Sequence, residues 1–340
     1  IKKGKKNILW RGKPIYFAKT SGTTSGIKYI PITKDSISNH IISARNAILC
    51  YIAEKKDASL VGGKMIFLSG SPILQKLHGI FIGRLSGIVN HHIPAYLRSN
   101  QLPSFKTNCI EDWETKIEKI VAETMDEDMQ LISGIPPWMI MYFEKLMAVK
   151  NTTIHQIFPN LKLLIHGGVN FQPYKQKIDE CIGKKIDCIE LFPASEGFFA
   201  FQNTLLDDGL LLNINSGIFY EFIPIDELSN INPTRINLSD VELNKQYALI
   251  VSSYAGLWGY NVGDTIKFVS LNPYKIRVTG RIKHFISAFG EHVITEEVEK
   301  SIIAVSQKFN IQIKEFTVAP LIKNTNNESY HEWYIEFDEV

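Results

Sequence analysis

The chain has 340 residues, of which 45% are hydrophobic and 21% are charged, and its formal net charge is +2. This composition is typical of a globular protein with one large domain or two unequal ones. The near-zero charge gives no reason to expect nucleic acid or an acidic membrane surface as a partner, and no apolar run is long enough to span a membrane. Because the sequence begins with Ile1 and ends in a strand-like run at Val340, we expect both native ends to be missing.

The cysteines and the start of the chain indicate the compartment. The four cysteines are Cys50, Cys109, Cys181 and Cys188. They form no Cys-x-x-Cys pair, and the chain opens with no signal-peptide pattern. We therefore expect reduced, mostly buried thiols and a cytoplasmic protein.

The first candidate site is a loop rich in hydroxyls and glycine. It follows a predicted strand at 14–18 and precedes a predicted helix at 37–52. Glycines let backbone N–H groups approach an anion, hydroxyls add donors, and Lys28 adds a point charge that suits phosphate. We interpret it as a phosphate-binding loop, although its spacing differs from a Walker A loop, and an exposed surface turn is the alternative. The residues before Ile27 and Lys28 are Thr20, Ser21, Gly22, Thr23, Thr24, Ser25 and Gly26.

Strands and helices alternate in the middle of the chain, which predicts an α/β sheet flanked by helices. Ligands of such sheets bind at the carboxyl ends of strands, where Gly167, Gly168 and Glu196 are expected. Glu196 is either hydrogen-bonded to the backbone or a ligand of Mg²⁺. The strands are predicted at 64–69, from 131 to a Pro-Pro turn at 136–137, at 161–165 and at 186–192, and the helices at 113–121, 138–147 and 173–182.

Arg84 lies in a segment, residues 79–98, that the pattern assigns to neither helix nor strand. Few other charges surround it. Two readings stay open, a structural arginine with an acidic partner and a contact to a substrate carboxylate.

The last third of the chain is β-rich, with predicted strands at 210–214, 218–223, 247–252, 265–270 and 276–279. Asp264 follows Gly263, a position typical of a turn, and its carboxylate could instead accept from ribose hydroxyls. Residues 280–283 break the last strand. We therefore predict a large α/β domain of mixed sheets and helices at 1–280 and a small, incomplete α+β domain at 281–340, with a helix at 296–309 and strands at 315–320 and 332–337.

Four motifs, at 20–28, 166–169, 192–196 and 260–264, followed by 280–283, occur in the order found in the acyl-adenylate-forming (firefly-luciferase-like) superfamily. More narrowly, the chain resembles the auxin-responsive acyl acid-amido synthetase family (the Gretchen Hagen type), and most closely its bacterial branch. The resemblance covers nearly the whole chain, including IFYEFIP at 218–224 and AGLWGY at 255–260.

The resemblance implies contacts to ATP for several residues. The loop 21–26 would hold the β- and γ-phosphates, and Ser195 would touch the α-phosphate. Asp264 would bind the ribose hydroxyls. The residues that would contact the adenine are Gly167, Gly168 and Val169, which line it, and Phe192, which stacks on it.

The resemblance also implies catalytic roles. Glu196 would hold Mg²⁺, and Lys28 would neutralise phosphate charge. Arg281 and Lys283 match the hinge between the two domains, and Arg84 lies near a substrate-contacting arginine of plant members. A late lysine that helps adenylation in many members would lie beyond the end of this sequence.

These roles predict an ATP-dependent ligase. A carboxylate attacks the α-phosphate of MgATP to give an acyl adenylate and pyrophosphate, and an amine, expected to be an amino acid, then attacks the acyl carbon and releases AMP. The expected partners are a small carboxylic acid and an amino acid, with no nucleic acid and no membrane. The alternatives are an acyl-CoA ligase that shares the first half-reaction and a nucleotide-binding protein without catalysis.

Overall fold

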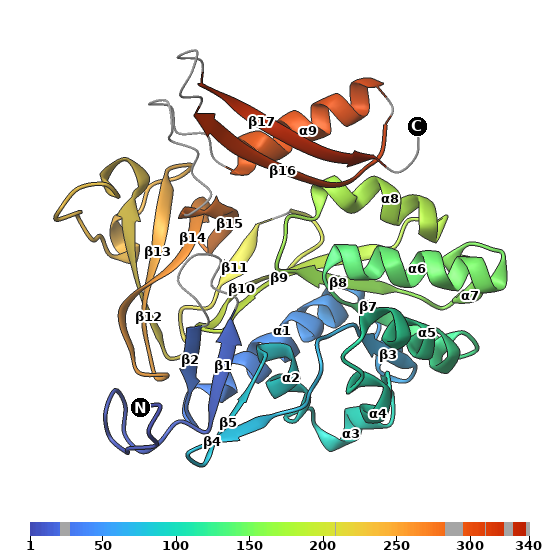
Figure 1. Ribbon diagram of the computed structural model, residues 1–340, viewed down its shortest axis with the longest axis horizontal. Helices are drawn as coiled ribbons and strands as arrows, with labels where there is room; N and C mark the ends of the chain where they lie inside the picture. Colours follow the sequence, from blue (N-terminus) through green and yellow to red (C-terminus); the bar gives the residue numbers. More distant parts are fainter. Residues whose placement is uncertain (21–27, 208, 283–294, 310, 323–328, 338–340) are drawn as a thin grey trace.

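The computed structural model describes residues 1–20, 28–207, 209–282, 295–309, 311–322 and 329–337 (Figure 1). The strands within these ranges are β1 (Tyr16–Thr20), β2 (Lys28–Ile32), β3 (Lys64–Phe67), β4 (Gln75–Leu77), β5 (Ile80–Gly83), β6 (Gln101–Leu102), β7 (Met129–Ser133), β8 (Leu163–Gly167), β9 (Asp187–Ala194), β10 (Gly197–Gln202), β11 (Leu210–Leu212), β12 (Ile218–Pro224), β13 (Gln246–Ser253), β14 (Leu257–Leu271), β15 (Tyr274–Arg281), β16 (Ile313–Ile322) and β17 (Ser329–Phe337). The α-helices are α1 (Ile37–Lys55), α2 (Leu85–Asn90), α3 (Ala95–Arg98), α4 (Phe105–Asn108), α5 (Trp113–Thr124), α6 (Pro136–Lys150), α7 (Ile154–Ile157), α8 (Gln172–Ile182) and α9 (Thr295–Phe309).

The described strands form two sheets in the large part of the molecule. The larger has the order β12-β13-β14-β15-β11-β10-β9-β8-β7-β3-β6, and the smaller has the order β2-β1-β5-β4. Strands β6, β3, β7, β8 and β9 run parallel, whereas the strands from β10 onward pair antiparallel. The predicted α/β class with mixed sheets is therefore confirmed.

Helices cover both faces of the parallel strands because these strands carry apolar side chains on both sides. Leu131 and Leu163 face α1, where they pack with Ala47 and Tyr51. The next residues along the strands, including Ile132, face α5, α6 and α8. This alternation follows from the two-residue period of a strand, and Figure 1 shows α5, α6 and α8 along one side of the sheet.

The helix predicted at 138–147 begins earlier than the sequence pattern indicated. It starts at Pro136, so the two prolines form its first turn instead of a separate turn before it. Proline is tolerated there because the first N–H groups of a helix have no partner within it. The segment 79–98, which had no assignment, contains β5, α2 and α3.

One expectation about the β-rich region is wrong, because Asp264 does not lie in a turn but inside β14. Strand β15 runs two residues beyond the predicted strand and ends at Arg281, within the predicted break at 280–283. The positive φ angles of Gly259, Gly263 and Gly280 let these long strands twist without ending.

The cysteines are free, as predicted, but only Cys181 is buried, and the other three are partly exposed. Within the described residues, no helix is both long and apolar enough to cross a membrane.

The last described elements form a separate unit of one helix and one hairpin. Strands β16 and β17 pair antiparallel, and α9 lies beside α8 of the large part (Figure 1). Of the boundary predicted at 280–283, the hinge residue Lys283 lies outside the described residues, and the boundary stays a prediction.

Candidate functional site

The two sheets bring their carboxyl ends together at one side of the molecule. In the smaller sheet, β1 and β5 are parallel, with Ala18 opposite Gly83. Arg84, directly after Gly83, and Thr20, two residues after Ala18, therefore emerge at the same edge. Thr20 also pairs with Lys28 across the β1–β2 ladder, so the predicted phosphate loop connects two fixed ends, although residues 21–27 lie outside the described residues.

Glu196 lies in the tight turn between β9 and β10, as a carboxylate at the end of a parallel strand. Burial raises its pKa above the usual value, and the negative charge of Asp264 raises it further. A backbone hydrogen bond and the positive charges of Lys28 and Arg281 act in the opposite direction. The structure thus brings four of the predicted site residues into one electrostatic cluster.

Tyr260 completes this cluster, and the sequence reasoning gave it no role. Its side chain hydrogen-bonds Glu196, and burial together with the charge of Glu196 raises the tyrosine pKa. The phenol therefore donates to the carboxylate and keeps it oriented.

Asp264 and Arg281 occupy facing positions on β14 and β15 and form a 3.0 Å ion pair. The Asp264 side chain is nearly buried, whereas the Arg281 side chain is 64% exposed. Asp264, the candidate for ribose binding, and Arg281, the candidate hinge residue, are thus in direct contact.

Ser195 and Glu196 also line a small pocket whose other side is formed by α1. Asn39 fixes this wall, because its amide accepts from Phe198 N at 2.7 Å and donates to Phe198 O at 3.2 Å. His40 beside it is 4% exposed, and burial lowers its pKa to about 4. Both were missed, because the helix sequence gives no clear apolar face: polar Ser43 is also buried, whereas Ile42 and Leu49 are exposed.

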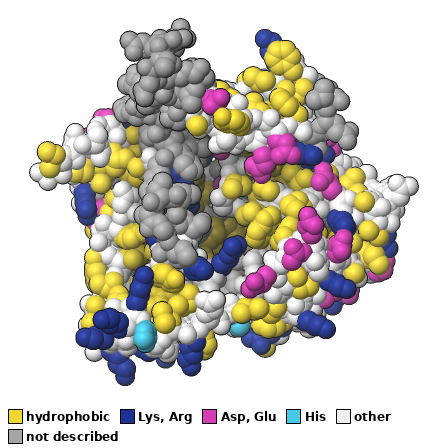
Figure 2. Space-filling model, in the orientation of Figure 1, with side chains coloured by type: hydrophobic (Ala, Val, Ile, Leu, Met, Phe, Trp, Pro, Cys, Tyr) yellow, Lys and Arg dark blue, Asp and Glu magenta, His cyan; other side chains and the backbone are white. Residues whose placement is uncertain are grey.

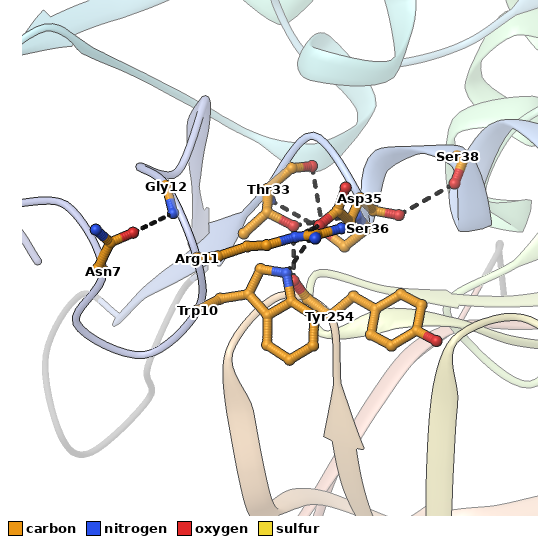
Figure 3. A network of polar contacts seen from close by, with 9 residues as sticks. All are labelled: Asn7, Trp10, Arg11, Gly12, Thr33, Asp35, Ser36, Ser38 and Tyr254. Carbon is orange, nitrogen blue, oxygen red and sulfur yellow. Dashed lines mark hydrogen bonds and ion pairs between the residues drawn. The ribbon is translucent and has the colours of Figure 1, made fainter.

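The N-terminal segment braces the turn between β13 and β14 next to this pocket (Figure 3). Thr33 Oγ1 donates to Tyr254 O at 2.6 Å, and the ring of Trp10 stacks on Tyr254 with centroids 5.2 Å apart. Trp10 Nε1 also donates to Asp35 at 2.9 Å. These contacts fix the start of β14, the strand that carries Tyr260 and Asp264.

The predicted adenine-binding residues lie at the ends of β8 and β9. A Cβ on Gly167 would approach Leu191 O to 2.3 Å, so only glycine fits there, and Gly168 has a φ of +83°. Val169 is 39% exposed. Phe192 is 8% exposed and packs edge-on against Phe199, so its ring belongs mainly to the core, and its stacking role stays a prediction.

Arg84 lies at the amino end of α2, directly after β5, and is exposed. Its side chain crosses Gly70, where a Cβ would meet Arg84 Cδ at 3.2 Å. No carboxylate of the described residues forms an ion pair with it, which argues against the reading as a paired structural arginine.

Comparison with models of known protein families shows which family the chain belongs to. The profile of the GH3 family N-terminal domain matches residues 1–107 and 80–186, and that of the GH3 family central domain matches residues 211–281. The chain belongs to the GH3 family. The resemblance read from the motifs is therefore confirmed, while its assignment to a bacterial branch stays a prediction.

Two curated GH3 relatives are plant enzymes. Jasmonoyl--L-amino acid synthetase JAR4 of Nicotiana attenuata is 29% identical over 123 residues, which cover 34% of this chain and 21% of that protein. Indole-3-acetic acid-amido synthetase GH3.3 of Arabidopsis thaliana is 39% identical over 49 residues, which cover 14% of this chain and 8% of that protein. The matched segments thus span about a fifth or less of these relatives.

Solved structures share the fold at low sequence identity. GH3.15 acyl acid amido synthetase superposes with a TM-score of 0.75 at 15% identity, over 96% of this chain and 66% of that one. 2-Hydroxyisobutyryl-CoA ligase superposes with a TM-score of 0.62 at 14% identity, over 96% of this chain and 63% of that one. Amide bond synthetase McbA from Marinactinospora thermotolerans superposes with a TM-score of 0.52 at 12% identity, over 95% of this chain and 59% of that one.

Proposed function

We propose that this GH3 chain binds MgATP and adenylates a small carboxylic acid, and that the acyl group then passes to an amino acid with release of AMP. The observation that carries the proposal is the cluster of Glu196, Asp264, Arg281 and Lys28 at the edge where the phosphate loop begins and ends. Family membership supports the reaction class, since the curated relatives are named as a jasmonoyl--L-amino acid synthetase and an indole-3-acetic acid-amido synthetase.

The chemistry of Glu196 fits a magnesium ion. It is a mostly buried carboxylate whose pKa is raised by burial, so a cation that pairs with it would offset an electrostatic cost. Magnesium commonly takes one or two carboxylates together with substrate phosphates. Bound there, it would neutralise charge on the phosphates.

The residues of the chain have the remaining tasks. Lys28, at the exit of the loop, would neutralise the phosphates, while backbone N–H groups of residues 21–26 would hold them. Asp264 would fix the ribose, and Ser195 would donate to the α-phosphate. Little covalent chemistry is required from the protein, because the step depends on placing the carboxylate in line with the phosphorus.

Arg84 would contact the carboxylate of the acid, because it emerges beside the end of β1, where the phosphate loop begins, and has no acidic partner among the described residues. An apolar wall for the acyl group is available at the start of α6, where Trp138 packs against Trp113 with ring centroids 4.5 Å apart. Figure 2 shows hydrophobic side chains gathered near the middle of this face, next to α6. An aryl or alkyl acid fits such a surface.

Carboxylate-dependent ATP–pyrophosphate exchange by the full-length protein, with a panel of aryl and alkyl acids, tests the first half-reaction. Exchange with any acid would support adenylation. ATP binding without exchange would favour a nucleotide-binding role, and no ATP binding would refute the proposal. Supplying either amino acids or coenzyme A to the adenylate then separates amide from thioester formation, a distinction that matters because a coenzyme A ligase shares this fold.

A further inference from the structure

Lys116, on α5, is a buried lysine without an acidic partner. It is 2% exposed, and its Nζ donates to two backbone carbonyls, Ser69 O at 2.7 Å and Asn108 O at 2.9 Å. No carboxylate of the described residues comes within ion-pair distance of it. Its Nζ also lies 6.0 Å from the ring centroid of Trp113. Burying an ammonium among neutral partners alone is costly, which makes this lysine unusual.

The lysine closes a set of contacts around the loop that follows β3. Asn108 Nδ2 donates to Ser69 Oγ at 3.3 Å, and Ser71 Oγ donates to Cys109 O at 3.4 Å. Together with the two bonds from Lys116, these contacts tie residues 69–71 to the corner between α4 and α5. The loop lies at the carboxyl end of a parallel strand, on the ligand-binding edge of the sheet.

This loop supports Arg84. Gly70 follows Ser69, and the Arg84 side chain lies across it, so that a Cβ on Gly70 would meet Arg84 Cδ at 3.2 Å. Arg84 is also an electrostatic neighbour of Lys116. The buried charge of Lys116 and the exposed charge of Arg84 therefore lie close enough to interact.

The polar groups around Lys116 are incompletely satisfied. Asn108 is 1% exposed and its Oδ1 has no hydrogen-bond partner among the described residues, and the same holds for Trp113 Nε1. An ammonium has three donors, of which two are used here. The Asn108 oxygen can only accept, whereas the third ammonium hydrogen and the Trp113 N–H can donate. These two spare donors and the surplus of positive charge suit an anionic ligand.

We propose that Lys116 is a positioning residue for the acid substrate: its buried ammonium holds the loop on which Arg84 rests and adds a second positive charge behind the guanidinium that receives the substrate carboxylate. The inference rests on the proposed function for the contact between Arg84 and the acid. The new element is that binding of the acid requires a positive charge on residue 116.

The proposal predicts that binding of the acid is coupled to a proton. Burial lowers the pKa of Lys116 to about 8, the charge on Cys109 opposes this, and Arg84 lowers it further. A bound carboxylate would raise it again, because an opposite charge favours the protonated amine. The acid should therefore bind best below about pH 8 and more weakly as the pH rises above that value.

ATP–pyrophosphate exchange with benzoate and hexanoate, from about pH 6.5 to about pH 9.5, tests the charge requirement. In the unchanged protein, the KM for the acid should rise about tenfold above pH 8 while the KM for ATP changes little. Lys116→Met should show the high KM for the acid at every pH. Lys116→Arg should keep the low KM for the acid at every pH, because arginine stays charged, and should therefore lose the rise above pH 8. Lys119→Met, an exposed lysine on the same helix, is the matched control and should leave both unchanged.

A purely structural lysine gives a different result. If Lys116 only stabilises the fold, Lys116→Met should melt at a lower temperature and its KM for the acid should still rise above pH 8. That outcome would overturn the proposal. If no acid supports exchange in the unchanged protein, the proposed function fails instead.

A second measurement does not need turnover. The Lys116 resonance in protein with isotope-labelled lysine, assigned by its loss in Lys116→Arg, should titrate below ordinary lysines and move to higher pH when acetate is added in excess. A titration that acetate leaves unchanged would overturn the inference even if the variants fold poorly.

Discussion

Asp264 and Arg281 face each other across the β14–β15 ladder and form a 3.0 Å ion pair in which only the arginine reaches solvent. The carboxylate proposed to bind ribose is thus oriented by the last residue of β15, directly before the segment proposed as a hinge.

Asp264→Asn should weaken nucleotide binding more than it weakens the fold. The amide cannot accept from two ribose hydroxyls as the carboxylate can, and we expect the KM for ATP to rise about tenfold or more. The stability loss should stay near 1 kcal/mol, because the guanidinium that loses its partner remains solvated. Nucleotide titration and thermal melting measure the two effects.

Asp240→Asn, at an exposed aspartate in the same half of the protein, is the control for this variant. Equal ATP affinity in Asp264→Asn and Asp240→Asn would remove Asp264 from the nucleotide site.

Glu196→Gln should separate activity from stability. If Glu196 holds the metal, adenylation should fall by on the order of a hundredfold or more, as expected on removal of a charged group at the reacting phosphates. The pKa of Glu196 is raised by burial, so the ionised carboxylate destabilises the fold at neutral pH, and the variant should melt at the same or a higher temperature. Exchange rates and melting curves at neutral pH measure the two effects, with Glu221→Gln as the control. A variant with near-normal adenylation would exclude the metal role.

The sequence predicted the elements whose signal is local. The acid at the end of a strand and the alternating central strands depend on nearby residues, and the structure places both as expected. The phosphate loop also has a local signal, but residues 21–27 lie outside the described residues. The first turn of α6 and the position of Asp264 were misread, because proline and Gly-Asp are equally typical of turns.

The parts of the site that were missed depend on contacts between distant segments. Asn39 contacts Phe198, and Tyr260 contacts Glu196, over separations that no periodicity reports. Lys116 was the hardest, since a lysine on an amphipathic helix is usually exposed, and its burial depends on carbonyls supplied by Ser69 and Asn108.

Gly167→Ala should disturb the edge at which adenine is proposed to bind. The new methyl group would meet a backbone carbonyl, Leu191 O, at 2.3 Å, so β8 and β9 must separate. We expect a loss of about 1–3 kcal/mol of stability and weaker ATP binding. Gly62→Ala is the matched control, since its φ is −80° and its nearest contact is 3.4 Å. If the two variants bind ATP equally well, Gly167 serves packing alone.

Acidification should destabilise the protein through two buried histidines. Burial lowers the pKa of His40 and of His166 to about 4, from an ordinary value of 6.5. Between these values the unfolded chain takes up protons that the folded chain does not, so stability is present above pH 6.5 and is lost as the pH falls toward 4. The loss should reach at most about 3 kcal/mol for each histidine.

Denaturant unfolding between pH 7 and pH 4 measures this dependence. His40→Gln and His166→Gln should each flatten it, because glutamine does not titrate, whereas His78→Asn should not, since His78 is exposed and asparagine tolerates its φ of +48°. His40 borders the pocket beside Glu196, so a bound nucleotide that further restricts this pocket should steepen the loss in the unchanged protein and not in His40→Gln. A pH profile that is the same in all three variants would mean that other groups, and not these imidazoles, control acid unfolding.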